Sequence, residues 1–218
     1  SPPDWNKLWV APFNIKEKLI YHIDREAELS TPQNPGMITM KINSLIDYEI
    51  IDHLYEAAQR HVKINLIVRG ICGINPFFLP KQFAKNINVI SILDRFLEHA
   101  RIYRFANNGD PVYYIGSADV MPRNIRRRIE VLLPIESDSI RRELDFILDC
   151  GLHDKRKGRR LTGPNKYSRP IPSELTEPTR SQYKLYNFYK TRLEKTREAI
   201  GRNETLTIFT SPNKEENK

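Results

Sequence analysis

Apolar residues recur along this chain at two spacings, one typical of helices and the other of strands. A spacing of three to four residues predicts helices at 15–27, 46–58, 140–148 and 185–200. Runs of β-branched and aromatic residues predict six strands, at 37–42, 64–68, 88–92, 101–105, 112–115 and 129–133. Strands and helices alternate in the first part of the chain, which favours the α/β class.

The connections between these elements indicate how the strands pair. Residues 37–68 run strand, helix, strand, and the right-handed crossover of such a βαβ unit implies two parallel strands in a buried sheet. Residues 107–110, Asn-Asn-Gly-Asp, are a strong turn signal and predict an antiparallel hairpin. The expected sheet is therefore mixed and flanked by helices.

Particular residues predict where the helices begin and end. Asn14 and Glu17 have the spacing of a capping box before the first helix, and Ser44 with Asp47 is expected to cap the second. Gly151 is expected to end the helix at 140–148. The basic segment that follows is expected to be a loop, which continues into a proline-punctuated linker.

The net charge of the chain and its distribution indicate which kind of partner the protein binds. The 218 residues suffice for one domain with attachments, and they carry 35 Lys and Arg against 27 Asp and Glu, a net charge of +8. This excess lies in two short clusters, at 123–128 and 153–160, each with a net charge of four. Focused charge favours a specific anionic partner, although two solvated loops would carry the same charges.

Several classes of protein are disfavoured. No apolar run approaches the roughly 20 residues of a membrane span. Cys72 and Cys150 are too few and too isolated for a disulfide framework or a zinc knuckle, so we expect reduced thiols in a cytoplasmic protein. The chain begins without Met, a basic region or an apolar region, so we expect no secretory signal and a piece of a longer protein.

One of the five histidines differs from the others. His99 precedes a predicted strand and stands two residues before Arg101, with Ser117 and Asn124 in the next segments. Such a set can surround a phosphoryl group, because an imidazole transfers a proton or attacks phosphorus, a guanidinium neutralises oxygens, and Ser and Asn hydrogen-bond them. A structural histidine at a strand end is the alternative. Ordinary surface positions are expected for His22, His53, His61 and His153.

Several ordered motifs resemble one protein family. They are Ile-Val-Arg-Gly-Ile-Cys at 67–72, Arg-Phe-Leu-Glu-His at 95–99, Tyr-Ile-Gly-Ser-Ala-Asp at 114–119, Met-Pro-Arg-Asn at 121–124 and Arg-Ile-Glu at 128–130. This set is similar to the carboxyl-terminal domain of polyphosphate kinases of the first type. The catalytic part of that family resembles two phospholipase D-like halves, and the similarity here is to the second half, from Val10 to Arg192.

The resemblance implies an α/β fold, a phospholipase D-like domain with a mixed β-sheet flanked by helices and an additional C-terminal helix. Residues 36–200 would form this catalytic domain. Residues 1–35 would be the remnant of the preceding catalytic half with its connector helix, and residues 201–218 a flexible tail.

The activity implied is reversible transfer of the ATP γ-phosphate to inorganic polyphosphate through a phosphohistidine in the missing half, so the isolated chain is expected to be inactive. The partners implied are ATP or ADP, polyphosphate and the rest of the kinase chain, with a homo-oligomer in the full enzyme and no nucleic acid. Mg²⁺ would be the cofactor, with its ligands outside this chain. The protein would be cytoplasmic, either free or peripheral to the inner membrane.

The resemblance also assigns roles to residues. Arg69 would contact nucleotide phosphates, and His99 would lie by the same phosphates as a general acid. Arg101, Ser117 and Asn124 complete the expected ATP and phosphate set by their chemistry, and no metal ligand is expected. Weaker polyphosphate contacts are expected from Arg123, Arg126, Arg127 and Arg128.

Glu130 and the basic segment at 153–160 each allow two interpretations. Glu130 could orient an imidazole or pair with an arginine, and the pairing is favoured. The basic segment at 153–160 could guide polyphosphate or be a solvated loop.

Two other functions stay open. A stand-alone phospholipase D-like phosphodiesterase or nuclease could build a complete site from two copies. Against it, Arg101 replaces the usual Lys of that motif, and Asp119 follows the Gly-Ser turn where Asn is usual. A non-catalytic nucleic-acid binder could rely on the basic clusters, but no recognised nucleic-acid motif is present.

Overall fold

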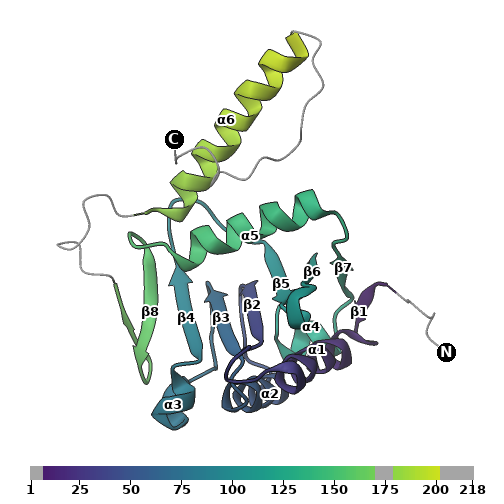
Figure 1. The fold of residues 1–218 in the computed structure, drawn as a ribbon, viewed down its shortest axis with the longest axis vertical. Coiled ribbons are helices and arrows are strands. Elements are labelled where there is room, and N and C mark those ends of the chain that lie inside the picture. The colour runs from purple at the N-terminus through teal and green to yellow at the C-terminus, as the bar shows by residue number, and fades with distance from the viewer. Residues whose placement is uncertain (1–6, 170–178, 202–218) are drawn as a thin grey trace.

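Nine strands form one sheet in the computed structural model, which describes residues 7–169 and 179–201 (Figure 1). The strands are β1 (Trp9–Ala11), β2 (Met37–Ile42), β3 (Lys63–Val68), β4 (Ile87–Ile92), β5 (Arg101–Phe105), β6 (Val112–Gly116), β7 (Glu130–Pro134), β8 (Gly158–Gly163) and β9 (Lys166–Ser168). The α-helices are α1 (Ile15–Leu29), α2 (Tyr48–Gln59), α3 (Lys81–Ala84), α4 (Pro122–Arg126), α5 (Asp138–Leu152) and α6 (Ser181–Gly201). Two 3₁₀ turns are η1 (Pro76–Phe78) and η2 (Asn107–Gly109).

The sheet is mixed, as predicted. Its order is β1-β7-β6-β5-β2-β3-β4-β8-β9. The three central strands β2, β3 and β4 are parallel, which confirms the βαβ unit, and the remaining pairings are antiparallel. All six predicted strands are present, with bounds that agree to within one residue.

Helices cover the two faces of the sheet. On one face α1 and α2 bury Ile23 and Leu54 against Met40 and Leu66 of the central strands. On the other face α5 buries Leu144 and Leu148 in a smaller cluster with β-strand isoleucines. Each fully buried Leu or Ile contributes about 1.5–3 kcal/mol, so these two layers hold the central strands in place.

One predicted helix cap and one predicted helix end are wrong. Asn14 does not cap α1: its Oδ1 accepts a hydrogen bond from the Val10 amide at 2.6 Å, so the side chain faces β1 and the capping box is absent. Gly151 does not end α5, which continues to Leu152. Gly151 instead permits close packing, because a Cβ there would lie 2.8 Å from Cδ1 of Ile67. The Asp47 cap of α2 is confirmed, with Oδ1 accepting from the Ile50 amide.

The first elements pack with the rest of the domain. β1 pairs with β7, and α1 lies beside α2 under the same face of the sheet (Figure 1). Residues 9–29 therefore share one core with the later strands. Whether they derive from a preceding catalytic half stays a prediction, and the tail after Gly201 lies outside the described residues.

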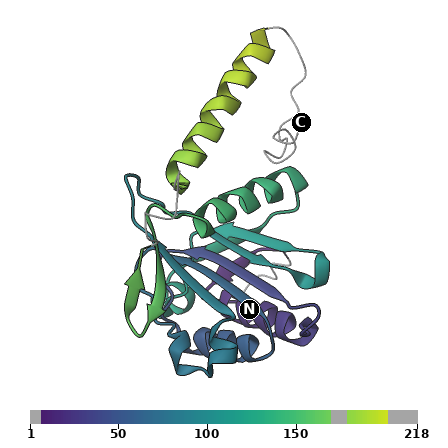
Figure 2. The same cartoon turned by 60° about the vertical axis from the view of Figure 1, so that its left-hand side comes forward.

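Two strands of the basic segment were not predicted. β8 pairs with β4 and β9 pairs with β8, so residues 158–168 form a hairpin at the sheet border rather than a loop (Figure 2). The segment is rich in charge and poor in β-branched residues, so its strand structure depends on pairing with β4. The predicted linker up to residue 178 falls largely outside the described residues.

The last helix is present but its apolar side is not buried. α6 projects away from the sheet (Figures 1 and 2), and Leu193 and Ile200 are 50% and 67% exposed. Its first half packs on α5, where the rings of Phe188 and Phe146 lie 4.6 Å apart. Among the described helices, α6 included, we find none both long enough and apolar enough to cross a bilayer.

Candidate functional site

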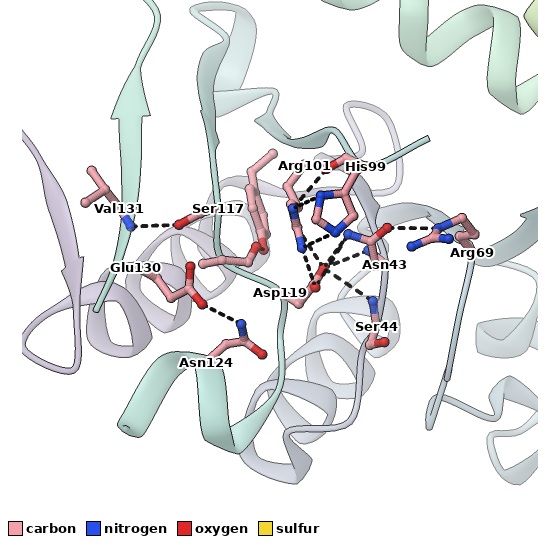
Figure 3. A network of polar contacts seen from close by, with 12 residues as sticks. Asn43, Ser44, Arg69, His99, Arg101, Ser117, Asp119, Asn124, Glu130 and Val131 are labelled. Carbon is pink, nitrogen blue, oxygen red and sulfur yellow. Dashed lines mark hydrogen bonds and ion pairs between the residues drawn. The ribbon is translucent and has the colours of Figure 1, made fainter. Parts of the chain in front are cut away.

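Polar side chains from several elements meet at one edge of the sheet. The parallel strands β2 and β3 end at this edge, and the antiparallel strand β5 begins there (Figure 3). Asn43 follows β2, Arg69 follows β3, His99 precedes β5, and Arg101 is its first residue. The carboxyl ends of parallel strands are the usual ligand-binding edge of α/β sheets, so the topology brings predicted residues together that lie up to 32 positions apart in the sequence.

A pocket of about 420 Å³ lies at this edge. It is lined by Asn43, Ser44, Arg69, His99, Arg101, Ser117, Asp119, Met121, Arg123, Asn124, Arg128 and Glu130. Four arginines face two carboxylates, so the lining carries an excess of positive charge. The pocket therefore suits an anion.

Asp119 organises the centre of the pocket. It is 6% exposed, and its carboxylate accepts hydrogen bonds from Arg101 Nη2 at 2.9 Å and Arg101 Nε at 3.3 Å. The same carboxylate accepts from the backbone amide of Asn43 at 2.7 Å. The side-chain Oδ1 of Asn43 in turn accepts from Arg69 Nε at 3.0 Å. One carboxylate thus holds Arg101 directly and Arg69 through Asn43 (Figure 3).

His99 is exposed and lies against Arg101. The Nη1 and Nη2 atoms of Arg101 are 3.1 Å from Nδ1 and 3.2 Å from Nε2 of the His99 ring. In-plane lone pairs of the two ring nitrogens diverge, so one guanidinium cannot make a linear hydrogen bond to both. Nη1 also donates to the His99 carbonyl at 2.9 Å. The guanidinium therefore fixes the backbone at His99 and contacts the ring, which is open to solvent.

The loop before His99 is anchored to the domain. Glu98 accepts from Lys41 of β2 at 2.8 Å, in an ion pair whose side chains are 19% and 9% exposed. Gln182 of α6 donates to Glu98 at 2.9 Å, and its Oε1 accepts from the Phe96 amide at 2.8 Å. These contacts restrict the position of His99 from both sides of the loop.

Ser117 and Asn124 form the other side of the pocket. Ser117 Oγ accepts from the Val131 amide at 3.2 Å, which leaves its hydroxyl hydrogen free to donate. Asn124 is 3% exposed and donates to Glu130 at 2.6 Å, whereas its Oδ1 is buried without a partner among the described residues. The favoured pairing of Glu130 with an arginine is wrong, because the carboxylate binds an amide instead.

The arginine cluster divides between two surfaces. Arg123 and Arg128 line the pocket, whereas Arg126 and Arg127 do not. Arg126 binds the buried Asp47 carboxylate at 3.0 Å. Arg123 and Arg126 belong to α4, whereas Arg127 and Arg128 follow its end. The structure thus brings two of the four predicted contact residues to the pocket, and their contact with polyphosphate stays a prediction.

His22 is not an ordinary surface residue. Its ring stacks on Trp9 and Phe105 at centroid distances of 5.1 and 5.0 Å. Burial, together with the nearby charges of Lys18 and Arg25, lowers the pKa of this imidazole to about 4. The residue is therefore neutral and structural. The predicted surface positions of His53, His61 and His153 are consistent with partial or full exposure.

The pocket contains residues that the sequence did not single out. Asn43 and Ser44 lie directly after a buried parallel strand, a position that marks the ligand edge of the sheet. Asp119 ends the motif at 114–119 and departs from the usual phospholipase D-like motif, but neither pattern assigns it a role in the pocket. In the described part of the chain, no group of three or more His, Cys, Asp or Glu side chains could hold a metal ion.

The sequence of this chain matches one family model and several known proteins. The family model described as "Polyphosphate kinase C-terminal domain 2" matches residues 8–182. The polyphosphate kinase of Staphylococcus haemolyticus is 48% identical over 157 residues, which are 72% of this chain and 22% of that protein. The polyphosphate kinase of Synechocystis is 42% identical over 179 residues, 82% of this chain and 24% of that protein. The chain thus spans about a quarter of these relatives.

Solved structures agree on the fold. The crystal structure of polyphosphate kinase from Porphyromonas gingivalis matches with a TM-score of 0.81 and 35% identity, over 89% of this chain and 30% of that one. Nuc from Salmonella typhimurium, a phospholipase D family member, matches with a TM-score of 0.50 and 12% identity, over 72% of this chain and 97% of that one. At that identity the second match concerns the fold alone. The expected phospholipase D-like α/β fold is confirmed.

Proposed function

This chain belongs to the polyphosphate kinase family, and we propose that its pocket binds the phosphates during reversible transfer of the ATP γ-phosphate to polyphosphate. In this proposal the phosphohistidine that carries the phosphoryl group lies in a part of the enzyme outside this chain. The chain would supply fixed cations and one imidazole, and the other part the nucleophile. The substrates proposed are ATP or ADP and inorganic polyphosphate.

The observation that supports the proposal most is the fixed position of two guanidinium groups. Arg101 is held by two contacts to Asp119, and Arg69 is held by Asn43. Phosphoryl transfer depends mainly on positioning and on neutralising charge, so cations that are already oriented cost little reorganisation during the reaction. Arginine suits this task because its planar group binds phosphate oxygens in pairs.

His99 would handle a proton at the departing oxygen of ADP. As the bond from phosphorus to this oxygen breaks, a protonated imidazole can donate its proton to the oxygen, and in the reverse direction the neutral ring takes it back. The ring contacts Arg101 in the structure, so the exposed ring would turn away when a phosphate binds to the guanidinium, which stays on Asp119. The exposed position of His99 leaves room for that change.

Ser117 and Asn124 would have different parts in phosphate binding. The free hydroxyl hydrogen of Ser117 can donate to a phosphate oxygen. Asn124 is committed to Glu130 and is almost fully buried, so it would act mainly by fixing the wall of the pocket. Arg123 and Arg128, which also line the pocket, would contact the polyphosphate chain.

Mg²⁺ is the cofactor that the family implies. The carboxylate of Asp119 is committed to Arg101 and Asn43, and that of Glu130 to Asn124. Because the described residues provide no cluster of metal ligands, we propose that the Mg²⁺ ligands lie outside this chain. The phosphodiesterase and nucleic-acid alternatives have no supporting observation beyond the fold and the net charge.

Ligand binding by the chain tests this proposal. Affinities for ATP and for tripolyphosphate are measured by calorimetry for the wild type, Arg69→Ala and His99→Ala, with Arg60→Ala as the matched control. Arg60 is exposed beside the end of α2, far from the pocket lining. We expect Arg69→Ala to weaken both ligands about tenfold or more, since a charged hydrogen bond contributes about 1.5–3 kcal/mol. If neither pocket variant changes either affinity, the site assignment is wrong.

A further inference from the structure

We propose that the basic hairpin, residues 155–169 including β8 and β9, is a second phosphate-binding surface that holds the polyphosphate chain beyond its reacting end. This inference rests on the proposed function of the pocket. It adds a separate site, because none of the pocket-lining residues belongs to the hairpin.

The hairpin carries positive charge without any acidic residue. Seven basic residues lie between positions 155 and 169, with no Asp or Glu among them. The exposed ones are Lys155, Arg156, Arg159, Lys166 and Arg169. None of these five side chains makes a hydrogen bond or ion pair with another residue within 7–169 and 179–201. No side chain in the described part of the chain therefore neutralises their charges.

The register of the sheet places the hairpin beside the pocket. Ile67 pairs with Ile90, so continuing this register by two residues places Arg69 opposite Ile92. Ile92 pairs with Gly158, the first residue of β8. Adjacent strands lie about 4.8 Å apart, so the backbone of Gly158 is roughly 10 Å from that of Arg69. The start of the hairpin and the pocket therefore lie on the same edge of the sheet.

A buried carboxylate fixes the start of the hairpin. Asp154 is 1% exposed, and its Oδ1 accepts from the amides of Arg156, Lys157 and Gly158 at 2.9, 2.6 and 3.1 Å. Its Oδ2 accepts from the amide and the hydroxyl of Ser181 at 2.8 and 2.6 Å. The backbone is thereby tied to α6, which leaves the basic side chains outside. This support holds the backbone in place before any ligand arrives, so less conformational freedom is lost on binding.

The chemistry of the surface favours a bare phosphate chain over a nucleic acid. Single-stranded nucleic acids bind to grooves in which aromatic rings stack on the bases. Tyr167 is the only aromatic residue between positions 155 and 169. Polyphosphate has no bases and offers negative charge along its whole length, which a row of cations can neutralise with release of counterions. The five exposed basic side chains of the hairpin provide such cations.

Chain-length dependence of binding tests the inference. The hairpin variant is Lys155→Gln, Arg156→Gln, Arg159→Gln, and the matched control removes three charges from α6 by Lys190→Gln, Lys195→Gln, Arg197→Gln. All six side chains are exposed. We expect the hairpin variant to bind long-chain polyphosphate about tenfold or more weakly, with a salt slope lowered by about three. Its affinity for tripolyphosphate should equal that of the wild type, and the α6 control should match the wild type for both ligands.

Several results would contradict the inference. Unchanged long-chain affinity in the hairpin variant overturns the second surface, while the proposed pocket stands if Arg69→Ala still weakens tripolyphosphate. Failure of the wild type to bind tripolyphosphate overturns the pocket itself. Displacement of long polyphosphate by single-stranded DNA at equal phosphate concentration would make the hairpin a nucleic-acid interface instead. A Lys-for-Arg variant at Arg156 and Arg159 keeps the charge, and it should retain long-chain affinity and confirm that folding is intact.

Discussion

The ion pair between Asp119 and Arg101 should be essential for the stability of the pocket. We consider Asp119→Asn, which removes the negative charge and retains the size of the side chain. The two side chains are 9% and 11% exposed, and the carboxylate also accepts from the Asn43 amide. The substitution leaves a nearly buried guanidinium without its counter-charge and presents an amide group to it.

The expected cost follows from this burial. Removing one partner of a buried ion pair typically costs about 3–5 kcal/mol. Because Asn keeps one acceptor oxygen for Arg101 or Asn43, we expect a loss of about 3 kcal/mol in the free energy of unfolding. Asp145→Asn is the matched control, since Asp145 binds Arg104 at 3.0 Å but its side chain is 47% exposed. An exposed pair of this kind contributes about 1 kcal/mol or less.

Urea unfolding of the two variants and the wild type gives these free energies. A double-mutant cycle with Arg101→Met should recover a coupling of about 2 kcal/mol, because removing both charges leaves no unpaired one. The account of the pocket would be refuted if Asp119→Asn cost no more than Asp145→Asn. A coupling near zero in the cycle would equally show that the pair does not act as a unit.

Three further predictions concern the core. Burial lowers the pKa of His22 to about 4, so below pH 6.5 the unfolded chain binds a proton at this residue that the folded chain does not bind. The free energy of unfolding should therefore fall by about 1–2 kcal/mol from pH 7 to pH 4.5. His22→Phe should show less of this fall in urea titrations at the two pH values. Gly116→Ala should cost about 3 kcal/mol in thermal unfolding, because its Cβ would lie 1.9 Å from the Val131 carbonyl; an unchanged midpoint would contradict that contact. Burial raises the pKa of Cys72 to about 11, so alkylation at pH 8 should be slow in the native protein and fast in urea.

The local sequence predicts the central part of this fold well. The runs at 37–42 and 101–105 match β2 and β5 to the residue, because β-branched and aromatic residues between turn signals specify a buried strand regardless of distant contacts. The hairpin at 101–116 likewise depends on a local Asn-Asn-Gly-Asp turn. These elements are determined by short-range preferences that agree with the tertiary fold.

Elements that depend on distant partners were not predictable in this way. β8 contains Gly, Arg, Arg and Thr, and it is a strand because β4 presents an open edge to it. Gly151 lies within α5 because Ile67 packs against it, although the local pattern indicates a helix end. His22 lies off the apolar stripe of its helix, yet Trp9 and Phe105 enclose it.

The candidate site shows the same division. The motifs point to Arg69, His99 and Arg101 directly, and the sheet brings all three to one pocket. Asp119 and Asn43 could be recognised as partners of these arginines only from the fold, because Asp119 is 18 positions from Arg101 and Asn43 is 26 positions from Arg69. Arg126 shows the opposite case, since its place in a basic cluster suggests a ligand contact while it binds Asp47.

The most direct test of the central claim is a nuclear magnetic resonance titration of the chain with tripolyphosphate. The side-chain Nε–Hε signals of Arg69 and Arg101 and the ring signals of His99 are followed, with those of Arg60 and His61 at the opposite edge of the sheet as controls. We predict that the signals of the three pocket residues shift together with one saturable dissociation constant while the controls stay in place. Saturable shifts that leave Arg69, Arg101 and His99 unchanged would contradict the proposed phosphate-binding pocket.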